Sequence, residues 1–251
     1  MRGTIYLGGG GSPDDEHLLW AEMFRLNANI LYWPFALDGE MLNGADAWLR
    51  GNLAQHWPDH QLTTWTDLDG HAPDELLDFD LLFIGGGNTF HLLAHVASHA
   101  FIDPIRRFVA EGGSLYGGSA GAILASDSIE IAATHDDNNT QLEQFTGLRL
   151  VSGVTVLPHY TAHEEATAKM WHRRQNKPAL GIPERSGLFV GSSGARVVGK
   201  EPVYVIDERA VQPVNPENYL PAGLTAANDN SKDGLAAQGP VPVSSGDSEQ
   251  G

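Results

Sequence analysis

The sequence predicts an α/β protein in which helices flank a doubly wound, mostly parallel sheet. Short apolar runs alternate with helical patterns from residue 4 to residue 125, and this alternation is typical of βαβ units. Residues 80–84 (DLLFI) are apolar enough to indicate a strand that is buried on both faces of such a sheet. Several runs end in glycines and pass directly into helices. Ligands on parallel sheets bind at these carboxyl ends, so we expect the functional site there.

The elements follow one another along the chain. Ser12 and Pro13 mark the start of the first helix, since serine is a common N-cap and proline fits the first helical position. The predicted strands are residues 4–7, 29–37, 61–66, 80–84, 114–116, 129–133, 151–157 and 180–182, and further helices cover 40–57 and 162–175. A terminal β segment is predicted at 187–190, 196–198 and 203–206.

The chain divides into one domain and a tail. Residues 1–209 form the predicted α/β domain, and 251 residues in total are enough for one such domain with an appendage. Residues 210–251 are rich in proline, alanine, serine and glycine and show no apolar period. That composition predicts a mostly disordered tail without a chemical role.

Composition excludes several function classes. The net charge of −17 argues against nucleic acid and anionic membranes as partners, because phosphate binding needs a basic face. The absence of cysteine excludes disulfides, zinc–thiolate sites and a cysteine nucleophile. No basic and apolar leader begins the sequence, and no apolar run approaches the ~18 residues that span a bilayer. We therefore expect a soluble cytoplasmic protein.

A serine lies at a glycine-rich turn near the middle of the chain. Residues 117–121 read GGSAG, follow the apolar run 114–116, and precede the helix-forming sequence AILA. This is the G-x-S-x-G pattern of a nucleophile elbow, in which glycines leave room for a strained turn and the hydroxyl projects above the sheet. The first N–H groups of the next helix can hold an oxyanion. We predict Ser119 as a nucleophile; the alternative is an inert loop serine.

A serine nucleophile needs a base and a group that orients the base. His159 comes just after the apolar run 151–157, and Glu184 has the same placement after residues 179–183. Both therefore fall at strand ends. We expect them on the sheet edge that carries Ser119, as a Ser-His-Glu triad.

The third member of this triad stays open between acids. Asp136 and Asp137 lie in a polar segment and are the competing choice, or else substrate-binding acids. The chain order Ser, His, acid differs from the order Ser, acid, His of α/β-hydrolases, so that fold is disfavoured despite the shared elbow.

Other polar clusters give weaker signals. His91, His95 and His99 are four residues apart and share one helix face, but no acidic residue accompanies them in that segment. We interpret them as partly exposed helix residues and predict no metal site. The glycine run 8–11 lacks the lysine of a P-loop and the G-x-G-x-x-G spacing, so it predicts a tight turn rather than a nucleotide site. No cofactor is expected.

Four motifs together resemble the peptidase E and cyanophycinase family of serine peptidases. They are FIGGGNTFHLL, GGSAGA, a Pro-His pair after a strand, and GIPE. The likeness runs from about residue 4 to residue 207 and is strongest over residues 81–125. It implies a fold similar to that of class I glutamine amidotransferases, with serine in place of their cysteine, and it implies a homodimer.

The resemblance also implies residue roles. Ser119 matches the nucleophile, His159 the base, and Glu184 the acid of the family's glycine–apolar–Pro/Asp–Glu motif. The residues implied to form or shape the oxyanion hole are Gly86, Gly87 and Ala120, and Asn88 is implied to contact substrate.

Substrate specificity rests on one further position. In peptidase E an arginine downstream of the histidine recognises the substrate aspartate, and Arg173 is the nearest match, with Arg174 as the alternative. The His-x-Glu of amidotransferases is absent after His159, which favours a peptidase. The expected function is a serine exopeptidase for small peptides, with aspartyl dipeptidase activity as a candidate. The alternatives are a cyanophycinase-like hydrolase and a non-catalytic small-molecule-binding module.

Overall fold

The computed structural model describes residues 3–25 and 27–225. The strands are β1 (Ile5–Gly8), β2 (Asn29–Trp33), β3 (Gln61–Thr64), β4 (Leu81–Ile84), β5 (Ser114–Gly118), β6 (Thr155–Pro158), β7 (Ala179–Ile182), β8 (Ser186–Gly191), β9 (Gly194–Gly199), β10 (Val203–Ile206) and β11 (Val211–Val214). The α-helices are α1 (His17–Met23), α2 (Gly39–His56), α3 (Thr89–Ser98), α4 (Ile102–Ala110), α5 (Ala120–Leu124) and α6 (Glu165–Gln175). Short 3₁₀ helices are η1 (Pro73–Asp78), η2 (Glu130–Thr134) and η3 (Ala162–Glu164).

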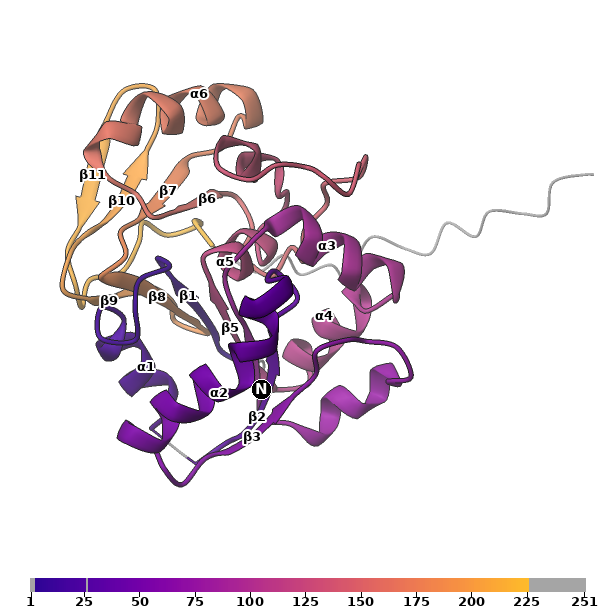
Figure 1. Ribbon diagram of the computed structural model, residues 1–251. Helices are drawn as coiled ribbons and strands as arrows, with labels where there is room; N and C mark the ends of the chain where they lie inside the picture. The colour runs from indigo at the N-terminus through magenta and orange to yellow at the C-terminus, as the bar shows by residue number, and fades with distance from the viewer. Residues whose placement is uncertain (1–2, 26, 226–251) are drawn as a thin grey trace, which may run out of the picture.

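The strands form two sheets (Figure 1). The larger sheet has the order β3-β2-β4-β5-β1-β8-β9. Strands β1 to β5 run parallel to one another, and β8 runs antiparallel to both of its neighbours, β1 and β9. The smaller sheet has the order β11-β10-β7-β6, and only β6 and β7 in it are parallel. The predicted α/β class, a mostly parallel sheet flanked by helices, is confirmed.

Alternate residues of the large sheet pack into two cores. On β4, Leu81 and Phe83 face the core that includes α1 and α2, whereas Leu82 and Ile84 face the core that includes α3, α4 and α5. A period of two places successive side chains on opposite faces, so a strand covered on both sides must be apolar throughout. Leu81–Ile84 of the DLLFI run therefore form a strand that is buried on both faces of the sheet, as predicted.

One of the predicted strands is absent from the residues that the structure describes. Residues 129–133 are not a strand, because residues 130–134 form η2, in which Ala132 donates its N–H to the carbonyl of Ile129. A short apolar run does not by itself distinguish a strand from a buried helical turn.

The domain boundary at residue 209 is also too early. Val211–Val214 pair with β10 as β11, and Val214 and Leu220 are buried. The remainder of the predicted tail, residues 226–251, lies outside the described residues. In the described part of the chain, no helix is both long and apolar enough to cross a membrane.

The first helix begins later than predicted. Ser12 does accept the N–H of Asp15 through its hydroxyl, as a capping serine should, but the regular helix starts only at His17. The residues between form a turn.

Candidate active site

Ser119 sits on a strained turn between β5 and α5. Its backbone angles are φ 50° and ψ −108°, a region that a non-glycine residue enters only when its surroundings enforce it. A Cβ on Gly117 would lie 2.5 Å from the backbone of Gly121, and a Cβ on Gly121 would lie 2.5 Å from the carbonyl oxygen of Ile84. The two outer glycines of the G-x-S-x-G pattern are therefore required by contacts with the helix and with β4.

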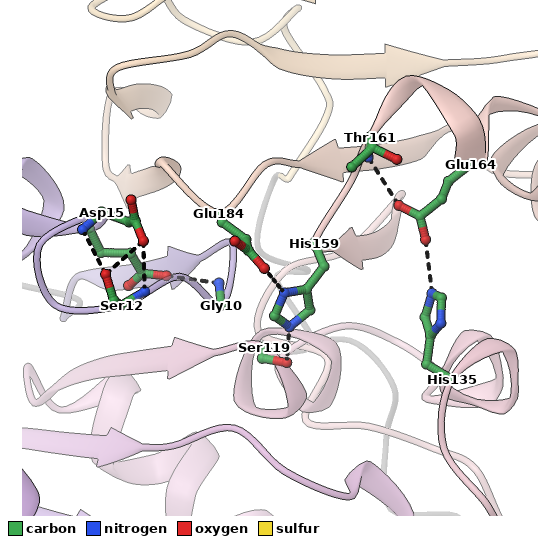
Figure 2. Close-up of polar contacts among 10 residues, drawn as sticks. Gly10, Ser12, Asp15, Ser119, His135, His159, Thr161, Glu164 and Glu184 are labelled. Carbon is green, nitrogen blue, oxygen red and sulfur yellow. Dashed lines mark hydrogen bonds and ion pairs between the residues drawn. The ribbon is translucent and has the colours of Figure 1, made fainter.

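Ser119, His159 and Glu184 form one hydrogen-bonded chain (Figure 2). The distance from Ser119 Oγ to His159 Nε2 is 2.8 Å, and the distance from His159 Nδ1 to Glu184 Oε1 is 2.9 Å. Because a carboxylate only accepts, Nδ1 of a neutral His159 donates to Glu184 and Nε2 accepts from the serine hydroxyl. This tautomer leaves Nε2 free to take the serine proton.

The three residues come from different parts of the fold. Ser119 follows β5 of the large sheet, His159 follows β6 of the small sheet, and Glu184 lies in the turn that joins β7 to β8. The expectation that Ser119 and His159 share one sheet edge is wrong, because β6 pairs only with β7 in the small sheet. Each of the three residues nevertheless lies just after a strand, as the sequence indicated.

A glycine loop after β1 holds the histidine. The carbonyl of Gly9 accepts the backbone N–H of His159 at 2.8 Å. A Cβ on Gly10, whose φ is 91°, would lie 2.4 Å from His159 Cε1 and 2.9 Å from Ser119 Cβ. The sequence indicated only a tight turn here. The structure shows that glycine is needed because the loop approaches the side chains of both Ser119 and His159.

Glu16 is a buried acid directly beneath this loop. It is 2% exposed, and its carboxylate accepts the N–H of Gly10 at 2.8 Å, the Tyr116 hydroxyl at 2.5 Å and the Trp20 indole N–H at 3.2 Å. Burial raises the pKa of Glu16 to about 7, although these hydrogen bonds act in the opposite direction. Nothing in the sequence around Glu16, which follows two aspartates, indicated this buried position.

The residues expected around an oxyanion lie close to the serine. A Cβ on Gly86 would come within 3.1 Å of Ser119 Cβ, and Ala120 is the first residue of α5, where helix N–H groups lack intrahelical acceptors. Within the described residues, neither Gly86 nor Gly87 donates its N–H to a protein acceptor. The side chain of Asn88 has protein partners: its oxygen caps α3 by accepting the N–H of His91, and its nitrogen donates to the carbonyl of Asp137.

Asp136 and Asp137, the alternative acids, form hydrogen bonds with residues other than His159. Asp136 Oδ2 accepts the N–H of Thr89 at 2.8 Å, and Asp137 contributes its backbone carbonyl to Asn88. These bonds tie the polar loop after η2 to the start of α3. The carboxylate at His159 Nδ1 is that of Glu184.

Two cavities reach Ser119 from opposite sides. The first, of about 440 Å³, lies over the core of α1 and α2, and the second, of about 340 Å³, is bordered by His159, His135 and Asp136. Neither Arg173 nor Arg174 lines either cavity; Arg173 is exposed on α6, and Arg174 pairs with Glu130. A larger hollow of about 920 Å³ lies by the amino ends of β4 and β5, at the wrong end of the sheet for a ligand site.

The α3 histidines His95 and His99 lie near an acidic residue, Asp67, that is distant from them in sequence. One ligand atom each from Asp67, His95 and His99 lies within 4.8 Å of the others, although Asp67 is exposed. His99 Nε2 lies 2.9 Å from Asp69 Oδ1. Within the described residues, Asp67, His95 and His99 form the group whose side chains could hold a metal ion together. None of the three lines the cavities at Ser119.

Known proteins resemble this chain in sequence and in fold. Peptidase E of Shewanella sp. (strain W3-18-1) is 32% identical over 138 residues, which cover 51% of this chain and 57% of the relative. Peptidase E of Pasteurella multocida (strain Pm70) is 32% identical over 148 residues, or 54% of this chain and 62% of the relative. The chain thus matches little more than half the length of these relatives.

The fold is shared with a solved structure. A peptidase from an acI-B1 Actinobacterium superposes with a TM-score of 0.64 at 19% identity, over 87% of this chain and 96% of that one. At such identity the likeness concerns the fold alone. The family model for "Peptidase family S51" matches residues 5–198, which include Ser119, His159 and Glu184. The chain therefore belongs to peptidase family S51.

Proposed function

We propose that the protein is a serine peptidase for short peptides, with Ser119 as nucleophile, His159 as base and Glu184 as the acid that orients the base. The observation that carries this proposal is the unbroken chain from Ser119 Oγ through His159 to Glu184, with contacts of 2.8 Å and 2.9 Å. Both contacts lie within the range in which a proton can be transferred or held.

The residues then act in a fixed order. His159 Nε2 takes the proton of Ser119 Oγ as the oxygen attacks the peptide carbonyl, and the resulting imidazolium is stabilised by Glu184. N–H groups near Gly87 and Ala120 stabilise the tetrahedral oxyanion, each such donor typically contributing ~10²–10³ in rate. His159 next protonates the leaving amine, and water hydrolyses the acyl-enzyme by the same route. No cofactor is needed for these steps.

The shape of the site supports short substrates. The two cavities beside Ser119 are about 440 Å³ and 340 Å³, each large enough for one side chain and part of a backbone. We therefore favour an exopeptidase or dipeptidase. Aspartyl specificity is not favoured, because among the described residues no lysine or arginine lines either cavity.

A fluorophosphonate probe tests the proposal. The wild-type protein is expected to be labelled at Ser119 and to hydrolyse members of a dipeptide panel, whereas Ser119→Ala should lose both properties and still fold. Ser192→Ala is a matched control, since Ser192 is an exposed serine in the turn between β8 and β9 and should leave labelling unchanged. Full hydrolysis by Ser119→Ala, or no labelling of the wild type, would favour the non-catalytic binding module instead.

A further inference from the structure

The 440 Å³ cavity beside Ser119 is apolar and carries no charge. Its wall consists mainly of aromatic rings, with glycines around the serine at one end. The aromatic residues are Trp20, Tyr32, Trp48, Phe83 and Tyr116. Among residues 3–25 and 27–225, no aspartate, glutamate, lysine, arginine or histidine lines it. A charged substrate group would lose its hydration here without gaining a partner, so the cavity selects against such groups.

The polar ends of two wall residues are already satisfied. Glu16 accepts from both the Trp20 indole N–H and the Tyr116 hydroxyl, and it lies behind these rings rather than in the cavity. The rings therefore present carbon surface to the cavity while their donors point away from it. Such an arrangement is suited to contact with an aromatic or large aliphatic side chain.

Exposed apolar side chains also surround the cavity. Met41 and Trp48, both on α2, are 64% and 46% exposed and line the same cavity. Large apolar side chains left in water beside a hollow usually mark a binding site, because burial by a ligand would be favourable. Gly44, on the same helix, lines the cavity too and leaves space for the ligand.

The position of His159 shows which side of the substrate occupies this cavity. His159 borders the smaller cavity, together with His135 and Asp136, and does not line the aromatic one. A base that protonates the leaving amine must face the leaving residue. The leaving residue is therefore placed in the smaller cavity beside His159, and the residue that is esterified to Ser119 places its side chain in the aromatic cavity.

We infer that the protein prefers peptides with a bulky apolar side chain, above all an aromatic one, on the acyl side of the scissile bond. This inference rests on the proposed function, because it assigns a substrate class to the same serine. It departs from aspartate recognition, for which the cavity offers no cation.

Active-site-directed phosphonates test the preference directly. Aminoalkyl diphenyl phosphonates with a phenylalanine, alanine or aspartate side chain mimic the acyl residue and label an activated serine. The phenylalanine reagent is expected to label Ser119 about a hundredfold faster than the aspartate reagent, and Phe-Gly should be cleaved faster than Asp-Gly or Gly-Phe. Equal rates, faster aspartate labelling, or a preference for Gly-Phe would overturn the inference while Ser119 remains labelled. A protein that no phosphonate labels contradicts the proposed function itself.

A pair of glycine substitutions on α2 checks the cavity. Gly44→Leu fills the cavity, and Gly51→Leu makes the same change two turns along the helix, outside the cavity. A Cβ at either glycine meets nothing within 4 Å, and leucine favours a helix more than glycine does, so both variants should fold. Gly44→Leu should reduce the ratio of phenylalanine to alanine labelling at least tenfold, and Gly51→Leu should not. An unchanged ratio in Gly44→Leu would show that the side chain binds elsewhere.

Discussion

The large and small sheets contribute different parts of the site. The large sheet holds Ser119 on a turn fixed by close glycine contacts, with β4 on one side and α5 on the other. The small sheet supplies His159, whose side chain is 41% exposed, and the turn that leaves it supplies Glu184, which is 56% exposed. Ser119 is thus held by close backbone contacts, whereas His159 and Glu184 lie at the surface.

This difference shows where the site is open to disruption. One backbone link between the two sheets runs through the glycine loop, where the Gly9 carbonyl accepts the N–H of His159. A change at the glycine loop should therefore disturb catalysis more than folding. The predictions below separate what the large sheet supplies from what the small sheet supplies.

The largest loss is expected from His159→Ala. Without a base, Ser119 keeps its proton, and kcat should fall by about 10⁴–10⁶, close to the loss for Ser119→Ala. The two losses should not add in the double variant, because the residues act as one unit. Steady-state kinetics on the best dipeptide measures this, and a fall of less than tenfold would remove His159 from the mechanism.

Glu184→Gln should have a smaller effect, about 10³ in kcat. The amide keeps the shape but no longer stabilises the imidazolium, and water can partly replace it because the side chain is half exposed. Asp136→Asn is the matched comparison, since its amide oxygen can still accept from Thr89; we expect a loss of at most tenfold. A larger loss for Asp136→Asn than for Glu184→Gln would exchange the roles of the two acids.

Gly10→Ala should reduce kcat about a hundredfold with the fold intact. Its methyl group would collide with the His159 ring, and displacing a reacting group by about 1 Å typically has an effect of this size. The circular dichroism spectrum and the unfolding curve of Gly10→Ala should resemble those of the wild type. Comparable loss of activity in Gly70→Ala, where φ is also positive but a Cβ meets nothing within 4 Å, would point to backbone strain instead.

Glu16→Gln should change the pH dependence of stability more than the activity. The pKa of Glu16 is raised from 4.5 to about 7, so the folded state retains a proton that the unfolded state releases, and the free energy of unfolding falls as pH rises across this window. At 1.36 kcal/mol per pKa unit this amounts to about 3 kcal/mol. Glutamine removes this titration. The free energy of unfolding of the variant, relative to that of the wild type, should therefore rise by up to that amount between pH 4.5 and pH 7.

Urea unfolding at several pH values tests this prediction. The variant is expected to be the less stable protein at pH 4.5. Its amide oxygen can replace only one of the two carboxylate oxygens, so the amide nitrogen, which cannot accept, faces either the Gly10 N–H or the donors of Trp20 and Tyr116. A stability difference that does not vary with pH would show that Glu16 titrates normally in the folded protein.

The sequence predicted the parts of the site that depend on local rules. Strand ends and glycine spacing located Ser119, His159 and Glu184, because a parallel strand delivers the residue that follows it to one predictable end. The buried strand β4 was equally readable, since two covered faces demand continuous apolar residues.

Contacts between distant segments were not readable in the same way. The role of Glu16 depends on Tyr116, one hundred residues away in sequence, and that of Gly10 depends on His159. The acidic neighbour of His95 also comes from a separate loop, at Asp67. Single-sequence patterns carry no information on such pairings, nor on which sheet a strand joins.

The pairing of β1 with β8 joins the start of the chain to residues that follow Glu184. Residues 5–8 at the start of the chain lie beside residues 186–191, and contacts of such large sequence separation form slowly because a long loop must first be closed. A nascent chain on the ribosome can present Ser119 before His159 and Glu184 have been synthesised. Ser119, His159 and Glu184 can therefore come together only after the chain has been synthesised beyond residue 184.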